Sequence, residues 1–123
     1  MIDFKNGAFL KLRKTNKTPG DVEELLINGE SAISSYITAR DYVVFTNKRI
    51  IAVNVQGLTG AKKDYTSIPY SKIQTFSIET AGMFDTDGEL EIYISSIGKV
   101  KFEFNGLCDI KAIGRIIAEY AMR

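Results

Sequence analysis

The feature that most constrains this chain is a change of hydrophobic period near Ser31. From there to residue 104, apolar and polar residues alternate in short segments that are separated by turn-forming residues. A repeat of two is typical of strands with one buried face. The pattern predicts seven strands, at residues 32–38, 42–46, 49–56, 62–69, 73–80, 89–95 and 99–104. Because the connections are short, we expect successive strands to run antiparallel.

The last two of these strands alternate most regularly. Their apolar residues fall on one face of each strand: Leu90, Ile92, Ile94, Val100, Phe102 and Phe104. Gly98 lies between the strands, where a tight turn favours glycine. Glutamates and lysines occupy the opposite faces, which predicts cross-strand ion pairs worth about 0.2–1 kcal/mol each.

Helical signals lie on both sides of the strands. Thr18 is a candidate cap, Pro19 suits a first helical position and Gly29 suits a left-handed stop, so we predict a short helix at 19–28. Asp109 is expected to cap a C-terminal helix. Its apolar stripe is formed by Ile110, Ile113, Ile117 and Tyr120. Seven strands with one apolar face each must close on themselves or pack as two sheets, and this helix is expected to plug the open end.

Residues 1–17 follow no single pattern. Apolar positions 2, 4, 9, 10 and 12 are interspersed with basic residues, so the segment could be an amphipathic turn of helix, a short strand or a frayed arm. Residues 1–18 contain five basic residues and one acidic residue, whereas the whole chain has a net charge of +1. We therefore divide the chain into an N-terminal arm of uncertain structure at 1–17 and a single domain at 18–123.

Four short segments carry a family resemblance. They are Phe45-Thr46-Asn47-Lys48-Arg49, Gln56-Gly57-Leu58-Thr59-Gly60, Ser67-Ile68-Pro69-Tyr70 and Phe76-Ser77-Ile78-Glu79-Thr80-Ala81-Gly82. Together with the order of elements, they make residues 43–94 resemble the bacterial pleckstrin-homology (PH) domain family, and the likeness extends from Val22 to the end of the chain. The resemblance implies a mainly β fold: a PH-like, seven-stranded, antiparallel, partly open barrel capped by the C-terminal helix. It also implies self-association into closed homo-oligomers, and no enzymatic activity.

The composition argues independently against catalysis and metal binding. The sequence has no histidine, which is the commonest general base and metal ligand, and its one cysteine is Cys108. Neither a Ser-His-Asp triad nor a structural zinc site can form from these residues. We interpret Cys108 as a small core residue and residues 85–89 as an acidic turn that enters a strand. No catalytic residue, cofactor, metal or small-molecule substrate is therefore expected.

Basic residues in two loops are the candidate binding site. In eukaryotic PH domains, phosphoinositide headgroups are held by basic residues around the first and third strand–strand loops, and the positions that match here are Arg40, Lys62 and Lys63. The dense basic motif of those lipid binders is missing from residues 36–41. The sequence thus predicts at most a weak contact with anionic membranes.

Residues 47–49 are interpreted as a hairpin turn with a basic rim, in which Arg49 could stack on a tyrosine or pair with a carboxylate.

These observations predict a non-catalytic, self-associating binding or scaffold module, and the alternative is a membrane-surface adaptor. An open barrel leaves strand edges, of which the strand ending at Pro69 is one, and such edges favour pairing with further copies or a protein partner. The small net charge and the lack of a stacking motif argue against nucleic acid. The start of the chain lacks a secretory signal and no apolar run is long enough to span a bilayer, which predicts a cytoplasmic location.

Overall fold

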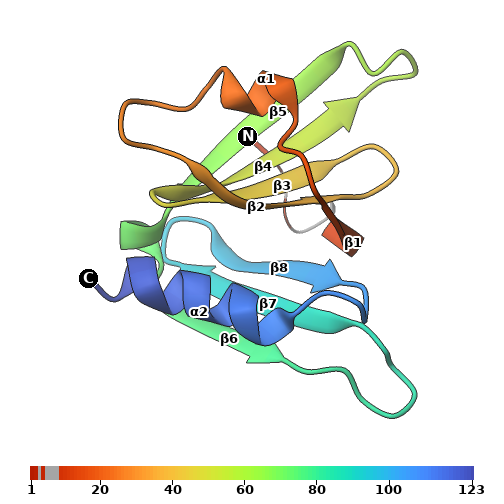
Figure 1. Ribbon diagram of the computed structural model, residues 1–123, viewed down its shortest axis with the longest axis vertical. Coiled ribbons are helices and arrows are strands. Elements are labelled where there is room, and N and C mark those ends of the chain that lie inside the picture. Colours follow the sequence, from red (N-terminus) through yellow and green to blue (C-terminus); the bar gives the residue numbers. More distant parts are fainter. Residues whose placement is uncertain (3, 5–8) are drawn as a thin grey trace.

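The computed structural model describes residues 1–2, 4 and 9–123, and its eight strands form one open sheet. Their bounds are β1 Phe9–Thr15, β2 Ala32–Ile37, β3 Tyr42–Thr46, β4 Arg49–Gln56, β5 Lys62–Pro69, β6 Thr75–Glu79, β7 Gly88–Ile94 and β8 Gly98–Phe104. The helices are α1 Gly20–Glu23 and α2 Ile110–Ala121, with a 3-10 turn, η1, at Tyr70–Lys72. The strand order is β5-β4-β3-β2-β1-β8-β7-β6. The sheet folds into two layers, and α2 lies along the layer that contains β6 and β7 (Figure 1).

The strand β1 joins the two halves of the sheet. It pairs antiparallel with β2, where Arg13 lies opposite Ile37, and parallel with β8, where Phe9 lies opposite Phe102. The short-strand alternative for the N-terminal segment is therefore confirmed over Phe9–Thr15, and the sheet has eight strands rather than the predicted seven. The expectation of a wholly antiparallel sheet is wrong at this one pairing.

A local irregularity explains why the sequence pattern did not predict β1. The register against β8 shifts between Phe9 and Leu12, and Lys11 between them has a φ of 56°. This irregularity places the two buried residues of the strand three positions apart, so its burial does not repeat every second residue. The expected basic arm also included Asp3 and Lys5, which lie outside the described residues.

The seven predicted strands are all present, with ends that differ by up to two residues. In the β3–β4 hairpin Phe45 pairs with Ile50, and the Thr46 hydroxyl accepts hydrogen bonds from the amides of Lys48 and Arg49, both at 3.0 Å. The predicted turn at residues 47–48 is therefore confirmed. The apolar residues of the β7–β8 hairpin are buried as expected. Its outer face carries two ion pairs, Glu89–Lys101 at 3.3 Å and Glu91–Lys99 at 3.8 Å.

The first helix is much shorter than the prediction of residues 19–28. Its cap position is Pro19, and the Thr18 hydroxyl instead lies 3.1 Å from the hydroxyl of Ser35 in β2. Beyond Glu23 the chain continues in tight turns, in which the Leu26 amide donates to the Glu23 carbonyl oxygen and the Leu25 carbonyl oxygen accepts a hydrogen bond from Arg49 at 2.8 Å. Gly29 has a φ of 79°, as the predicted left-handed stop requires.

The main core lies between the two layers of the sheet and α2. The Asp109 side chain accepts a hydrogen bond from the Ala112 amide at 3.0 Å, which confirms the predicted cap. The predicted stripe buries Ile110, Ile113 and Ile117, while Tyr120 stacks on Tyr70 of η1 with ring centroids 5.4 Å apart. A smaller core lies on the opposite face of β3 and β4, under α1, and consists of Val22, Val44, Ile51 and Val53. β3 and β4 thus contribute buried side chains from both faces.

Candidate binding surfaces

The loops that carry the predicted basic residues meet at one end of the β2–β5 layer. The Arg40 guanidinium, in the β2–β3 turn, donates a hydrogen bond to the Gly57 carbonyl oxygen in the β4–β5 loop. Lys62 and Lys63 begin β5 beside the same loop. The prediction matched these two loops to the first and third strand–strand connections. Because β1 adds a strand before them, they are the second and fourth connections of this chain.

Lys63 is occupied by contacts within the chain. Its ammonium group lies 3.2 Å from a carboxylate oxygen of Asp21, which also accepts hydrogen bonds from the hydroxyls of Tyr65, at 2.7 Å, and Tyr42. Burial raises the pKa of Asp21, but the hydrogen bonds from both tyrosines and Lys63 outweigh it and lower this pKa to about 2. Successive side chains of a strand point to opposite faces, so Lys62 and Lys63 do not face one ligand together. All three predicted residues are exposed, and within the described chain Lys63 is the one that forms an ion pair.

A buried ion pair holds the segment after α1 against the sheet. The Glu30 side chain is 0% exposed, and its carboxylate receives hydrogen bonds from Arg49 Nε at 2.9 Å and the Thr46 hydroxyl at 2.6 Å. Burial raises the pKa of Glu30, but the hydrogen bonds from Arg49, Thr46 and the Ile27 amide outweigh it, so this pKa is lowered. Of the two partners predicted for Arg49, a tyrosine ring or a carboxylate, the carboxylate is confirmed. Glu30 itself was missed, because its partner lies nineteen positions away in the sequence.

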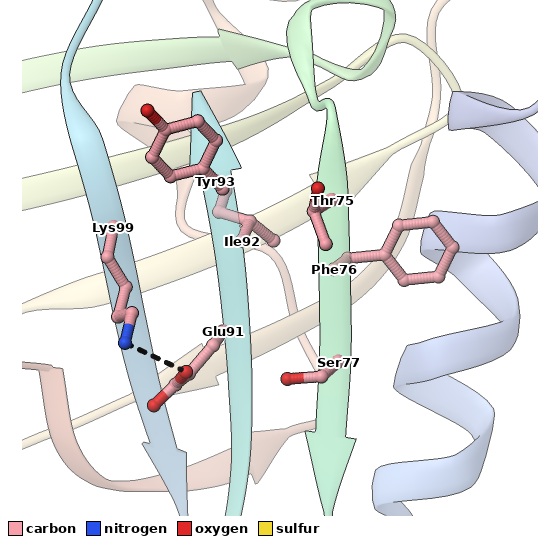
Figure 2. Close-up of a pocket in the computed structure, with 7 residues that line it drawn as sticks. All are labelled: Thr75, Phe76, Ser77, Glu91, Ile92, Tyr93 and Lys99. Atoms are coloured by element: carbon pink, nitrogen blue, oxygen red, sulfur yellow. Dashed lines mark ion pairs between the residues drawn. The ribbon is translucent and has the colours of Figure 1, made fainter. Parts of the chain in front are cut away.

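A small hollow lies against the edge strand β6. Figure 2 shows Thr75, Ser77, Glu91, Tyr93 and Lys99 around it, with Phe76 directed away from them toward the helix. Its volume is about 100 Å³, and Glu91 and Lys99 on its wall pair with each other. Pockets that enclose small molecules usually measure about 300–1,000 Å³. The hollow therefore offers a shallow surface beside a strand edge.

A larger groove runs between β6 and α2. It measures about 330 Å³ and is lined by Phe76, Ser77, Ile78, Lys111, Gly114, Arg115 and Ala118. Gly114 faces Ile78 so closely that a Cβ atom at this position would lie 3.0 Å from Ile78 Cγ2. The glycine thus brings the helix close to the edge strand. The floor of the groove is mostly apolar, and the exposed side chains of Lys111 and Arg115 stand at its rim.

The β6–β7 loop presents apolar side chains to solvent. Met83 is 88% exposed and Phe84 is 97% exposed, and Leu107, in the loop that precedes α2, is also exposed. The Gly82 amide donates to the Asp85 carbonyl oxygen at 2.6 Å, and the Asp87 amide donates to the Asp85 side chain at 3.1 Å. These bonds confirm the predicted acidic turn before β7. Met83 and Phe84, at the tip of this loop, are not among the predicted binding residues.

Cys108 is half-buried rather than fully enclosed. Its sulfur lies 3.6 Å from the Leu12 carbonyl oxygen and from the Asn105 side chain, and it packs against the main core. Burial raises the pKa of its thiol. A raised pKa lowers the fraction of reactive thiolate at neutral pH, which fits the interpretation of Cys108 as a packing residue.

Three comparisons relate the chain to known proteins. Residues 4–121 match the model of the family described as bacterial PH domain, so the match begins well before Val22, where the resemblance in the sequence begins. The uncharacterised protein YjqA of Bacillus subtilis (strain 168) is 40% identical over 104 residues, which cover 83% of each chain. The uncharacterised protein YozO of the same organism is 33% identical over 114 residues, covering 93% of this chain and 96% of that protein.

Solved structures have the same architecture. The crystal structure of a DUF1696 family protein with a pleckstrin-homology domain, from Shewanella loihica PV-4, has a TM-score of 0.80 and 34% identity and covers 91% of this chain and 98% of that one. A pleckstrin homology domain from Shewanella amazonensis SB2B has a TM-score of 0.63 and 40% identity, with 82% of each chain covered. None of the helices in the described parts of the chain is long and apolar enough to cross a membrane.

Proposed function

Because the chain belongs to the bacterial PH domain family, we propose that it acts as a non-catalytic, self-associating binding module. The observation that carries the proposal is the free edge of β6. Sheet edges are usually blunted by lysine or proline. The other edge strand, β5, carries Lys62 and Lys63 and ends at Pro69, whereas β6 reads Thr-Phe-Ser-Ile-Glu and has a charge only at its last residue. An unprotected edge offers backbone groups that a second chain can pair with.

The two edges of this sheet differ, and this has a consequence for assembly. A contact between unlike surfaces of identical copies leaves one of each surface free, so copies add head to tail until a ring closes or a filament grows. A closed ring leaves neither of the two contact surfaces exposed, which makes it the arrangement that we propose. A module of this kind needs no cofactor or substrate, and its partner is either another copy or a further protein.

Light scattering tests the proposal directly. At tens of micromolar the wild-type chain should have a mass that is a multiple of 13.7 kDa. The Ser77→Lys variant places a charge on the free edge, opposite Glu91, and should lower the mass while the fold stays intact. Ser71→Lys, on an exposed serine of η1, is the matched control and should retain the wild-type mass. A wild-type chain that stays monomeric at these concentrations would contradict self-association.

A second candidate function is weak contact with anionic membranes. Leu58 is fully exposed in the β4–β5 loop, between the basic residues Arg40 and Lys62, which also lie at this end of the sheet. An apolar tip flanked by bases is suited to a membrane surface. Because Lys63 is paired with Asp21, we expect Arg40 and Lys62 to carry the electrostatic part of the contact, about 1 kcal/mol each.

Vesicle co-sedimentation distinguishes this candidate from the first. Vesicles that contain phosphatidylserine should pellet the chain at low salt, and pelleting should fall on addition of salt or in the variants Leu58→Ser and Lys62→Glu. Uncharged phosphatidylcholine vesicles serve as the control. If the chain stays in solution with both kinds of vesicle at low salt, the membrane role is wrong.

We further propose a cytoplasmic location, where the unpaired Cys108 would stay reduced.

A further inference from the structure

We propose that Met83 and Phe84 of one copy insert into the groove between β6 and α2 of the next copy. The inference rests on the self-association proposed above and names the two surfaces that meet. The loop is the donor surface and consists of residues 82–87. The groove, lined by the residues given above, is the acceptor surface.

The donor loop is held in shape before it meets a partner. In addition to the two hydrogen bonds made by Asp85, Gly106 packs so closely against the loop that a Cβ atom there would clash with the Thr86 carbonyl oxygen. An ordered tip loses less conformational entropy on binding than a flexible one. Aromatic residues and methionine are enriched at protein interfaces and depleted from free surfaces. Met83 and Phe84, both almost fully exposed, are therefore suited to anchor a contact.

The acceptor groove matches this tip in size and in polarity. Its apolar lining consists of Phe76, Ile78, Gly114 and Ala118, and its volume of about 330 Å³ exceeds the roughly 150 Å³ of a cavity that holds a benzene ring. Ile78 already packs against Gly114, so an inserted ring would approach the helix beside Ala118, which has a short side chain. The groove also borders the free edge of β6, so a loop seated there would cover the edge identified above.

The acidic loop and the basic groove have complementary charges, which favours a second copy of this chain as the occupant of the groove. The donor loop carries Asp85 and Asp87 next to its apolar tip, and the acceptor rim carries Lys111 and Arg115. Asp87 already meets Lys11 at 3.4 Å, whereas Asp85 forms no ion pair within the described chain and is left to approach the rim. The complementary surfaces occur on the same polypeptide, so no other protein is needed to supply either of them. Attraction between the rim and the loop would also orient the approaching copies.

A mixing experiment tests the pairing of these two surfaces. The loop variant Phe84→Ser keeps an intact groove, and the groove variant Lys111→Glu/Arg115→Glu keeps an intact loop. All three residues are exposed, so we expect both variants to fold, and circular dichroism verifies this. By light scattering each variant alone should have the single-chain mass of 13.7 kDa. An equimolar mixture should form a species of twice that mass and no larger one, because one intact loop meets one intact groove.

Matched controls and the other outcomes separate this inference from the general proposal. Leu58→Ser removes an equally exposed apolar residue from another loop, and Lys14→Glu/Lys17→Glu makes the same change of charge elsewhere; both should keep the wild-type mass. If the wild type associates and Phe84→Ser retains its mass, or if the mixture stays at the single-chain mass, the loop–groove contact is wrong while self-association stands. A monomeric wild type overturns both.

Discussion

At the scale of single residues, the pairing of Glu30 with Arg49 has the largest expected effect. A carboxylate enclosed by protein is stable only if hydrogen bonds and an opposite charge replace the water that it lost. Arg49 supplies both, since its guanidinium contacts Glu30 at 2.9 and 3.0 Å and also the Leu25 carbonyl oxygen. One arginine on β4 therefore fixes the path of the chain between α1 and β2.

We expect Arg49→Met to lower the free energy of unfolding by about 3–5 kcal/mol at pH 7, because Glu30 would stay buried without its partner. Urea unfolding followed by tyrosine fluorescence measures this loss. In the wild type the pKa of Glu30 is lowered by folding, so its contribution is present above the unfolded pKa and declines as pH falls through the folded value. In the variant, protonation of Glu30 removes the unpaired buried charge, so the difference in stability from the wild type should shrink as pH is lowered.

The double variant Arg49→Met/Glu30→Gln provides the control for this prediction. It removes both charges and should recover part of the stability that Arg49→Met loses at pH 7. An equal loss in the single and double variants would mean that packing of the arginine, and not the buried charge, determines the effect.

At the scale of elements, α1 shows how a segment that is too short to be stable alone is held in place. A helix of four residues has no appreciable stability by itself. Val22 is fully buried in the smaller core, and Asp21 accepts hydrogen bonds from Tyr42 of β3 and from Tyr65 and Lys63 of β5. Two adjacent residues thus fasten the helix to the outer face of the sheet.

The Asp21→Asn variant should lose about 1–2 kcal/mol of unfolding free energy at pH 7, because hydrogen bonds to a charged acceptor are replaced by weaker ones. The pKa of Asp21 falls from 3.8 to about 2 on folding. Its stabilising contribution, about 2 kcal/mol at most, is therefore complete above pH 4 and is lost as pH falls from 4 to 2. The difference between wild type and variant should close over this range in urea titrations. A difference independent of pH would contradict the assignment.

At the scale of the whole molecule, β1 couples the two halves of the sheet. It is the only strand that pairs with both β2 and β8 in the described chain. Phe9 and Leu12 from this strand enter the main core, where the Phe9 and Phe102 rings lie 5.6 Å apart. The edges β5 and β6 stay unpaired at the two ends of the strand order. The same topology therefore predicts that the two halves unfold together, and it leaves the edge on which the proposed assembly depends.

We expect Leu12→Ala to lower the free energy of unfolding by about 2–5 kcal/mol, since the side chain is fully buried. Because β1 is shared by both halves, far-ultraviolet circular dichroism and tyrosine fluorescence should report the same transition midpoint in urea. Leu10→Ala, an exposed position in the same strand, is the control and should change stability by less than about 0.5 kcal/mol. Two separate transitions in the variant would show that the halves fold independently.

Seven of the eight strands in the described residues, the cap at Asp109 and the apolar stripe of α2 could be predicted from the amino-acid sequence. These features follow from local periodicity and from side chains that bond their own backbone neighbours, and both can be read within a few residues. The sequence also indicated the turn at residues 47–48 and the family resemblance.

The place of β1, the partner of Glu30, the pairing of Lys63 with Asp21 and the groove between β6 and α2 could not be predicted from local sequence. Each of these depends on residues far apart in the chain, such as Leu12 beside Phe104 or Ile78 beside Gly114. A local pattern shows which face of a strand is apolar. Which segment covers that face, and which edge is left free, are decided when the whole chain packs.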